Sequence, residues 1–364
     1  MEFHRTSRIA WVDIAKGICI ILMVLGHVGV PFVKYIYLFH MSAFLILSGF
    51  TGNHDKYTMG QFLVRKILTL VVPFYLINFL FVLGYAAAQY MGLSFCIPPS
   101  EVRPFFENTV CLFQPYTATP DLGGAMWFLI VLFWSELICH VICAVCKKLA
   151  FPKNVDIFLM VLLSGLGWFW IQTKAYLPWN IDLGLLACLF YAFGLFLRRY
   201  EVLEKHIEHK TAIPFSIIVC VFFAEFYFSG LPTNWPTRDF PSWGIMIVCA
   251  LSGFYLCYCI ANLLMNTLRW SDLLQYVGRN TFPILAWHFL SFRILNLAFV
   301  IVGHQPVTIL QELTPTMGST FFKIVYAFIT IGICLTVSKV ASRTRLTNYI
   351  VNASWTYSYY NRRI

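Results

Sequence analysis

Charged residues are scarce in this sequence, and acidic residues are the scarcest. Only 12% of the 364 residues are charged, with 16 Asp and Glu in total, whereas 59% are hydrophobic. A soluble globular domain usually contains about 25% charged residues, so this composition excludes an ordinary soluble protein. It predicts an all-α, polytopic integral membrane helical bundle. The first apolar run is too long for a removable signal peptide and lacks a small-residue cleavage site, so we expect it to remain as a span.

The sequence also shows no internal repeat, and no pair of broken apolar segments of the kind that marks many transporters. Most of its 12 cysteines fall inside apolar runs, where a free cysteine behaves as a small hydrophobic residue. We expect no metal site. Cys96 and Cys111 share one predicted extracytoplasmic loop, where they either form a disulfide or remain two free thiols.

The apolar runs predict about ten transmembrane helices. These cover residues 9–30, 35–51, 67–91, 126–146, 156–173, 181–198, 212–230, 243–266, 280–302 and 320–341. If the N-terminus is cytoplasmic, about 19 of the 26 Lys and Arg residues fall on cytoplasmic ends and loops, and about five on the opposite side. This bias predicts cytoplasmic termini, and it explains the net charge of +10 better than nucleic-acid binding does. We divide the chain into a transmembrane domain, 1–350, and a basic cytoplasmic tail, 351–364.

The first two predicted spans carry the ionisable residues Asp13, Lys16, His27 and His40. Each such group costs at least ~2.5 kcal/mol at the centre of a span, so it indicates a function. Helical spacing of about 100° per residue places Asp13, Lys16 and His27 on one face, with a rise of roughly 16 Å from Lys16 to His27. The short turn around Pro31 predicts an antiparallel hairpin that brings His27 near His40. The alternative is that each histidine is a satisfied core residue.

Several predicted loops and loop edges carry further candidates. Arg65 and Lys66 precede the third span, and Arg279 and Asn280 stand at the cytoplasmic start of the ninth. Arg65 and Lys66 either anchor the third span at the membrane surface or contact an anionic cofactor there. The longest predicted outer loop covers 92–125, and loops of this length usually cover a site.

Five residues inside or beside later spans complete the candidates. Trp127 fits either an interfacial aromatic belt or the lining of an acyl or sugar site. Glu136 and His140 share one helix face and form either a structural polar pair or part of a site. His288 lies near the middle of the ninth span, and Arg293 lies deeper still, where an arginine needs a partner or a water-filled cavity.

The order and spacing of six stretches resemble membrane-bound acyltransferase family 3, which comprises bacterial O-acyltransferases with about ten spans. The stretches are D-I-A-K-G…G-H at 13–27, F-H-M-S-A-F…S-G at 39–49, R-K-I-L-T-L-V-V-P-F at 65–74, W-F-L at 127–129, Y-x-x-G at 191–194 and Y-V-G-R-N-T…W-H at 276–288. The family usually has Arg where this chain has Lys16, and Pro where it has Ser42. The resemblance implies transfer of an acyl group, usually acetyl, from a cytoplasmic acyl-CoA to a sugar hydroxyl at the bacterial cytoplasmic membrane.

Such a transfer needs a base, an oxyanion donor and a positioned thioester. We expect His27 to be the general base, or a transient acyl carrier, and His40 or His288 to orient it, donate to the oxyanion or contact the acceptor. Residues assigned to the acyl-CoA site are Asp13, Lys16, Arg65, Lys66, Arg279 and Asn280. Residues assigned to the acceptor site are Trp127, Glu136 and Arg293.

The expected partners are acyl-CoA, a glycan or lipid-linked sugar, and membrane lipids, with no nucleic acid and no metal; the oligomeric state stays open. Two other functions remain. Intramembrane His, Asp and Glu residues also serve as proton relays in transporters, and the chain could be a structural subunit of a glycan-assembly complex.

Overall fold

The protein is a bundle of helices. A computed structural model describes residues 9–114, 119–203, 233–265, 267–314 and 318–353. Within these ranges the regular structure is helical, apart from one isolated bridge between Asn234 and Asp239. Nine helical segments in the described part are long and apolar enough to cross a membrane. The predicted all-α polytopic architecture is therefore confirmed.

The nine candidate spans coincide with nine of the ten predicted runs. They are Ala10–His27 (α1), Val33–Thr51 (α2, Val33–Tyr37, with α3, His40–Thr51), Met59–Tyr90 (α4, Met59–Lys66, with α5, Val72–Tyr90), Trp127–Lys148 (α7), Val155–Gln172 (α8), Pro178–Tyr200 (with α9, Ile181–Tyr200), Trp243–Met265 (α12), Thr281–Gly303 (α14) and Thr320–Ala341 (α15). Three shorter helices are α6 (Phe105–Phe113), α13 (Leu268–Arg279) and α16 (Arg345–Asn352). The tenth predicted span, 212–230, lies outside the described residues, as does most of the predicted tail.

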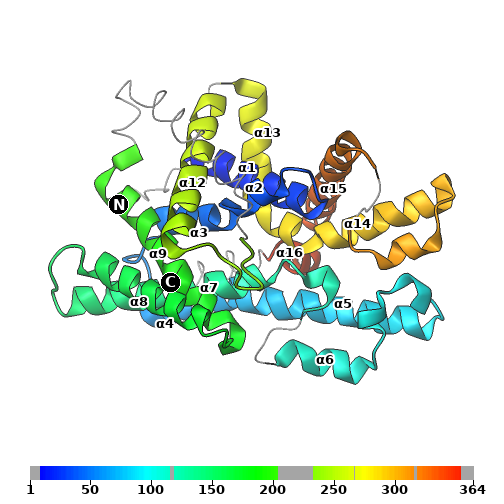
Figure 1. Cartoon of the computed structure of the whole chain (residues 1–364), viewed down its shortest axis with the longest axis horizontal. Helices are drawn as coiled ribbons and strands as arrows, with labels where there is room; N and C mark the ends of the chain where they lie inside the picture. The colour runs from blue at the N-terminus through cyan, green and yellow to red at the C-terminus, as the bar shows by residue number, and fades with distance from the viewer. Residues whose placement is uncertain (1–8, 115–118, 204–232, 266, 315–317, 354–364) are drawn as a thin grey trace.

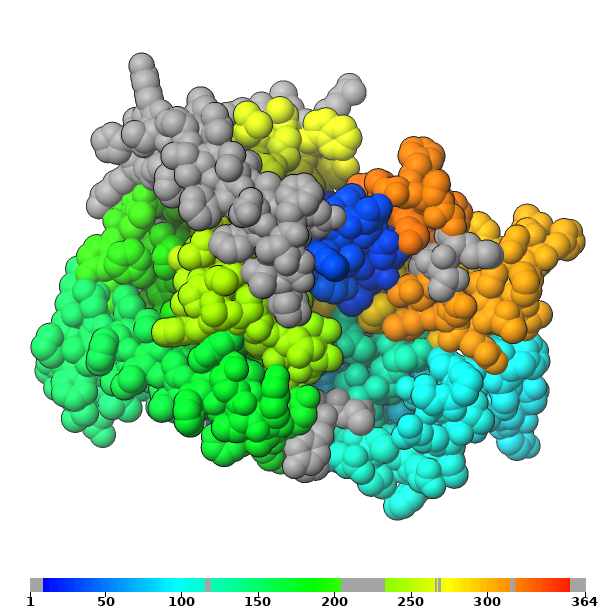
Figure 2. Space-filling model, in the orientation of Figure 1, coloured from blue at the N-terminus to red at the C-terminus, as the bar shows by residue number. Residues whose placement is uncertain are grey.

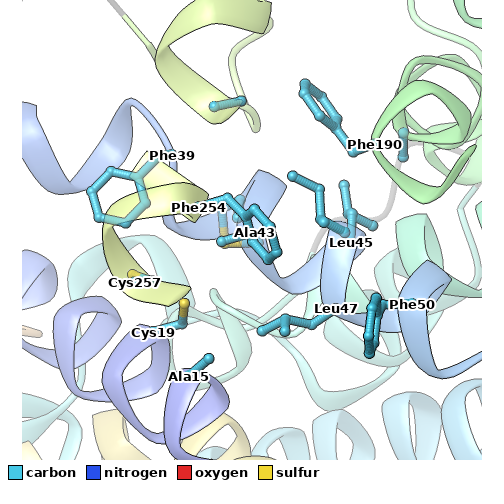
Figure 3. Packing of buried hydrophobic residues seen from close by; sticks show 14 of the residues in the cluster. Ala15, Cys19, Phe39, Ala43, Leu45, Leu47, Phe50, Phe190, Phe254 and Cys257 are labelled. Atoms are coloured by element: carbon cyan, nitrogen blue, oxygen red, sulfur yellow. The ribbon is translucent and has the colours of Figure 1, made fainter. Parts of the chain in front are cut away.

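Helix α1 lies near the middle of the molecule (Figure 1) and contacts α3, α12, α13, α14 and α15. Small side chains make this close packing possible. Figure 3 shows Ala15 and Cys19 of α1 beside Cys257 and Phe254 of α12, with Ala43 of α3 nearby. Figure 2 shows the blue surface of the first helices between the yellow-green segment after residue 233 and the orange segment that includes α15.

Glycines bring two pairs of helices into backbone contact, and these glycines belong to the stretches that carry the family resemblance. A Cβ atom on Gly278 of α13 would lie 1.8 Å from the backbone oxygen of Asp13, and one on Gly17 of α1 would lie 2.4 Å from a backbone oxygen of α13. Gly49 of α3 and Gly194 of α9 face each other's helices in the same way, each at 2.0 Å. Small residues at such crossings let membrane helices approach closely. The first and last stretches are therefore adjacent in space.

A π-helical turn, Ile67–Val71, separates α4 from α5. Pro73 follows it, and in an α-helix a proline ring clashes with the carbonyl four residues earlier. That carbonyl belongs to Thr69, within the wider turn, so the turn accommodates Pro73. Cys96 and Cys111 are free thiols in this structure.

Candidate functional site

A cavity of about 260 Å³ lies where α1 ends and where α3 and α7 begin. We call it the histidine cavity. Its walls include His27, Tyr37, His40, Trp127 and the segment 233–236. The structure thus brings together both histidines of the predicted hairpin and the tryptophan predicted to line a site.

His27 lies against His288 at the end of α1. The two ring centroids are 5.2 Å apart, and the Phe289 ring is 4.8 Å from that of His27. His288 Nδ1 donates to the backbone oxygens of Ile284 and Leu285, each at 3.0 Å, so the lone pair is on Nε2. This Nε2 is buried and has no hydrogen-bond partner among the described residues. The nearest ionisable ring to it is that of His27.

His40 is fixed in the same way. Its Nδ1 donates to the backbone oxygen of Ile36 at 2.8 Å, which leaves the Nε2 lone pair free. The Tyr37 ring lies between the two histidines of the hairpin, with its centroid 5.4 Å from His40 and 6.4 Å from His27. Of the two imidazoles that line the cavity, that of His40 has its tautomer set by a backbone carbonyl, whereas His288 packs against His27 and does not line the cavity itself.

A short hairpin that the sequence analysis missed forms one wall of the histidine cavity. Asn234 and Asp239 exchange backbone hydrogen bonds of 2.7 and 3.0 Å. Arg238, whose side chain is 10% exposed, donates to Asp182 of α9, which is 1% exposed, over 3.0 Å. The hydroxyl of Thr233 is buried in this wall without a partner among the described residues. The available signal was an arginine in a short loop and an aspartate at the edge of a distant span.

A second cavity, of about 1200 Å³, lies at the opposite end of the bundle. We call it the basic cavity. This position follows from the direction of the helices. The histidine cavity lies where α1 ends and where α3 and α7 begin, whereas α1 begins beside the basic cavity and α3, α7 and α9 end beside it. Its cationic lining residues include Lys16, Arg65, Lys66, Arg198, Arg199 and Arg279. Because Lys and Arg outnumber Asp and Glu in its walls, the cavity favours anions.

Two predicted cations of the basic cavity are bound to carboxylates. Arg279 Nε donates to Asp13 over 2.9 Å, across the glycine crossing of α13 and α1. Lys66 forms an ion pair with Glu136, which also accepts a 2.7 Å hydrogen bond from Ser48. Glu136 was assigned to the acceptor site, but the structure places it in the basic cavity beside Lys66.

His140 does not pair with Glu136, although the two share a face of α7. Its Nδ1 lies 3.2 Å from Nδ1 of His54, and its ring stacks on Phe62 with centroids 3.8 Å apart. Burial first, and the neighbouring His140 second, lower the pKa of His54 to about 4. His54 is therefore neutral at pH 7 at the edge of the basic cavity.

The remaining residues assigned to the acyl-CoA site lie in different surroundings. Arg65 donates to the hydroxyl of Tyr57, at the wall of the basic cavity. Asn280 lines neither cavity, and its amide donates to the backbone oxygen of Tyr276 at 2.7 Å. Arg198 was not predicted as a site residue, yet it faces the basic cavity and lies over the Phe50 ring, 5.5 Å from the centroid. Its signal was the basic pair that ends the sixth predicted span.

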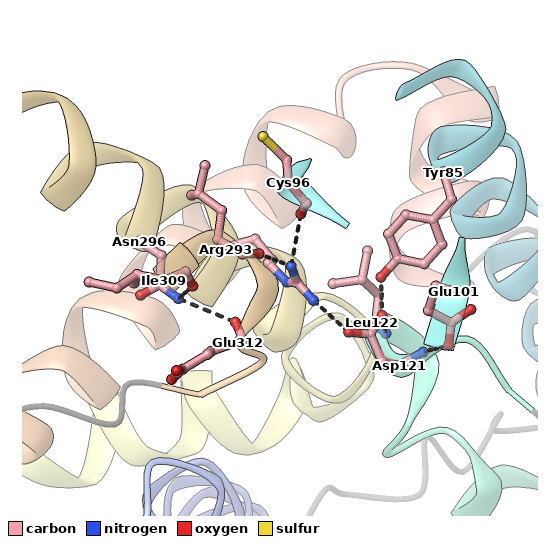
Figure 4. A network of polar contacts seen from close by, with 10 residues as sticks. Tyr85, Cys96, Glu101, Asp121, Leu122, Arg293, Asn296, Ile309 and Glu312 are labelled. Carbon is pink, nitrogen blue, oxygen red and sulfur yellow. Dashed lines mark hydrogen bonds and ion pairs between the residues drawn. The ribbon is translucent and has the colours of Figure 1, made fainter. Parts of the chain in front are cut away.

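Arg293 lines neither cavity and instead fastens the long loop before α7 (Figure 4). Its guanidinium donates to Asp121 over 2.5 Å, to the backbone oxygen of Cys96 over 3.2 Å and to that of Leu310. Tyr85 donates to the same carboxylate. The prediction that an arginine at this depth needs a partner is confirmed, and the partner is Asp121.

Three side chains belong to the walls of both cavities. They are Met23 of α1, Met41 of α3 and Leu285 of α14. We call them the partition, because in the part of the chain that the structure describes they are the side chains shared by the histidine cavity and the basic cavity. A route between opposite ends of the bundle is thus interrupted by apolar side chains.

Comparison with known proteins gives one match. A family model described as an acyltransferase domain matches residues 9–339, a range that contains every stretch on which the resemblance rests. The curated proteins and the solved structures give no match. Among the described residues, no group of three or more His, Cys, Asp or Glu side chains is arranged to hold a metal ion.

Proposed function

Because the chain belongs to acyltransferase family 3, whose model matches residues 9–339, we propose that it transfers an acetyl group from cytoplasmic acetyl-CoA to a hydroxyl of a glycan or lipid-linked sugar. His27 is the general base. One observation carries this proposal: His27 lines a cavity that shares three wall side chains, among the described residues, with a larger, cation-rich cavity at the other end of the bundle.

The basic cavity supports a site for the CoA part of the donor. CoA is polyanionic, and guanidinium groups bind phosphate in bidentate fashion. Arg198 forms no ion pair with a described residue, so it can meet a phosphate without giving up a carboxylate partner. Lys66 and Arg279 exchange their carboxylate partners for donor phosphates or remain as the frame of the site. The positive-inside bias of the sequence favours a cytoplasmic position for this end.

The distance between donor site and base fits an extended donor. Lys16 lines the basic cavity and His27 the histidine cavity, and the rise between them is roughly 16 Å along α1. A donor held by its phosphates extends its pantetheine arm along α1, past the partition, so that the thioester carbonyl reaches His27. The acceptor hydroxyl enters the histidine cavity from the other side.

Transfer then needs one proton movement and one exchange of bonds. His27 takes the hydroxyl proton as the acceptor oxygen attacks the thioester carbon. The new C–O bond forms, the C–S bond breaks, and the proton passes from His27 to the departing sulfur. The products are an O-acetyl ester and CoA. A neutral imidazole suits the role of base near pH 7.

The residues around His27 support the proposal that they position its ring and the acceptor. His288 Nε2 has no partner among the described residues, and the two rings lie 5.2 Å apart, so a rotation of the His27 ring would let one of its nitrogens donate to His288 and leave the other as the base. His40 and Trp127 face the space assigned to the acceptor. The hairpin 233–236 closes this space opposite α1.

The test uses purified protein in detergent with acetyl-labelled acetyl-CoA and a glycolipid extract from membranes. We expect wild type to move label from the thioester to glycolipid, and His27→Ala to fold but lose transfer. His304→Ala is the matched control, because His304 is exposed and lines neither cavity. Full transfer by His27→Ala would rule out the assigned base. An intact thioester with wild type would favour a transporter.

A second measurement identifies the acceptor. Mass spectrometry of surface glycans from cells with and without this protein should show O-acetyl groups that depend on it. Identical glycans in both cell types would contradict a glycan acceptor.

A further inference from the structure

The partition between the two cavities is apolar and closely packed. Met23 is 2% exposed and Met41 is 8% exposed, and Leu285 completes the division. Side chains in a packed interior leave no passage wider than a water molecule. A donor in the basic cavity therefore reaches His27 only if these side chains move apart.

Each partition residue stands beside one of the three histidines. Met23 lies one helical turn before His27, and Met41 directly follows the histidine that begins α3. Leu285 lies one turn before His288 and accepts its Nδ1 hydrogen through the backbone oxygen. The three apolar side chains thus form a layer next to the three imidazoles, on the side that faces the basic cavity.

We propose that Met23, Met41 and Leu285 form a filter that passes narrow, unbranched acyl groups to His27 and rejects branched ones. This inference rests on the proposed transfer from acyl-CoA. The acyl group is the leading end of the donor, so it crosses the partition before the arm behind it. The arm next to the sulfur is an unbranched chain, and an opening that admits it also admits an acetyl group.

A branched acyl group is wider than that opening. Methionine has three rotatable bonds and yields to a thin chain, whereas Leu285 is branched and its backbone is tied to His288. The filter therefore opens by methionine rotation up to a limit that Leu285 sets. One methylene too many in such a site lowers kcat/KM by about 10- to 200-fold.

The test compares acetyl-CoA with isobutyryl-CoA as donors for the purified protein. We expect wild type to prefer acetyl-CoA by at least about tenfold in kcat/KM, and Met23→Ala and Leu285→Ala to reduce that preference about tenfold. Met41→Phe should slow transfer from both donors, because the larger side chain narrows the partition. Met160→Ala is the matched control, because Met160 is as deeply buried but packs between α7, α8 and α9 and lines neither cavity.

The outcomes separate the filter from the underlying reaction. Acetyl transfer with an unchanged donor preference in both alanine variants overturns the filter and leaves the proposed function standing. Equal use of the two donors by wild type also overturns it. If wild type cleaves neither acetyl-CoA nor isobutyryl-CoA, the proposed function itself is contradicted. If the alanine variants fail to fold, Leu285→Val should shift the preference in the same direction by a smaller factor, and no shift overturns the filter.

Discussion

Replacing Gly278 by alanine tests whether the glycine crossing of α1 and α13 positions the site. The added Cβ would lie 1.8 Å from the backbone oxygen of Asp13, and real Cβ atoms are essentially never closer than 3.0 Å to a neighbour. The two helices must therefore separate by at least 1.2 Å, the difference between these two distances. Neither partner at the clash can rotate away, because one is a backbone atom and the other is a Cβ.

Separation has consequences for stability and for transfer. It would lengthen the 2.9 Å contact between Arg279 and Asp13 beyond hydrogen-bond range. Overpacking of this kind costs about 1–3 kcal/mol, and a shift of about 1 Å at a site can lower the rate about 100-fold. We expect Gly278→Ala to lower both the thermal unfolding midpoint in detergent and the rate of acetyl transfer.

Gly332→Ala is the control for this prediction. Gly332 lies inside α15, and a Cβ there would meet nothing within 4 Å. Alanine favours a helix over glycine by about 1 kcal/mol, so this variant should be as stable as wild type or more stable, with unchanged transfer. If Gly278→Ala matched wild type in both measurements, the close crossing would not position the site.

Three further predictions concern charged and titrating groups. Asp182→Asn leaves the buried Arg238 without its carboxylate, so the thermal midpoint should fall by the equivalent of about 3–5 kcal/mol; an unchanged midpoint would show that the hairpin does not need the pair. The pKa of His54 is lowered from 6.5 to about 4 in the folded protein. Between these two pH values the unfolded chain binds the proton and the folded protein does not, so the stability of the fold decreases as the pH falls from 6.5 to about 4. His54→Gln should shrink the difference between midpoints at pH 7 and pH 5, whereas an equal difference would contradict the assigned environment. Lys16→Gln should raise KM for acetyl-CoA about tenfold or more, because it removes a charged contact to the donor; steady-state kinetics that show a changed kcat alone would contradict this role.

The spans could be predicted because lipid leaves the backbone few choices. A long apolar run in a membrane must satisfy its own hydrogen bonds, and a helix does so within one segment. The predicted runs 35–51 and 126–146 therefore correspond to Val33–Thr51 and Trp127–Lys148. The same cost of burying charge explains why a partner for Arg293 could be expected before Asp121 was known.

Which distant residues meet could not be predicted. Helical periodicity assigns Asp13 and Lys16 to one face but does not reveal that α13 packs there and brings Arg279 to Asp13. Glu136 and His140 share a face, yet each finds a partner on another element, because those partners come from α4 and from the loop before it. The sequence identifies these residues but does not reveal which residues lie next to them in space.

The hairpin beside the histidine cavity was missed for a related reason. Its sequence is a short, mostly polar loop with one proline, Pro236, which is typical of an ordinary connection. The buried pair between Arg238 and Asp182 and the buried Trp235 ring beside Phe190 hold it against the bundle, and both contacts join segments far apart in the chain. The partition was missed because apolar residues in a span carry no pattern that marks a shared cavity wall.

The central claim is that His27 receives its two substrates from opposite ends of the bundle. Sealed membrane vesicles of known orientation, supplied with labelled acetyl-CoA on one face only, test it directly. We expect label on membrane glycans when acetyl-CoA is at the face of the basic cavity, little label when it is at the other face, and none with His27→Ala in either case. Equal labelling from both faces, or labelling only from the face of the histidine cavity, would contradict the account.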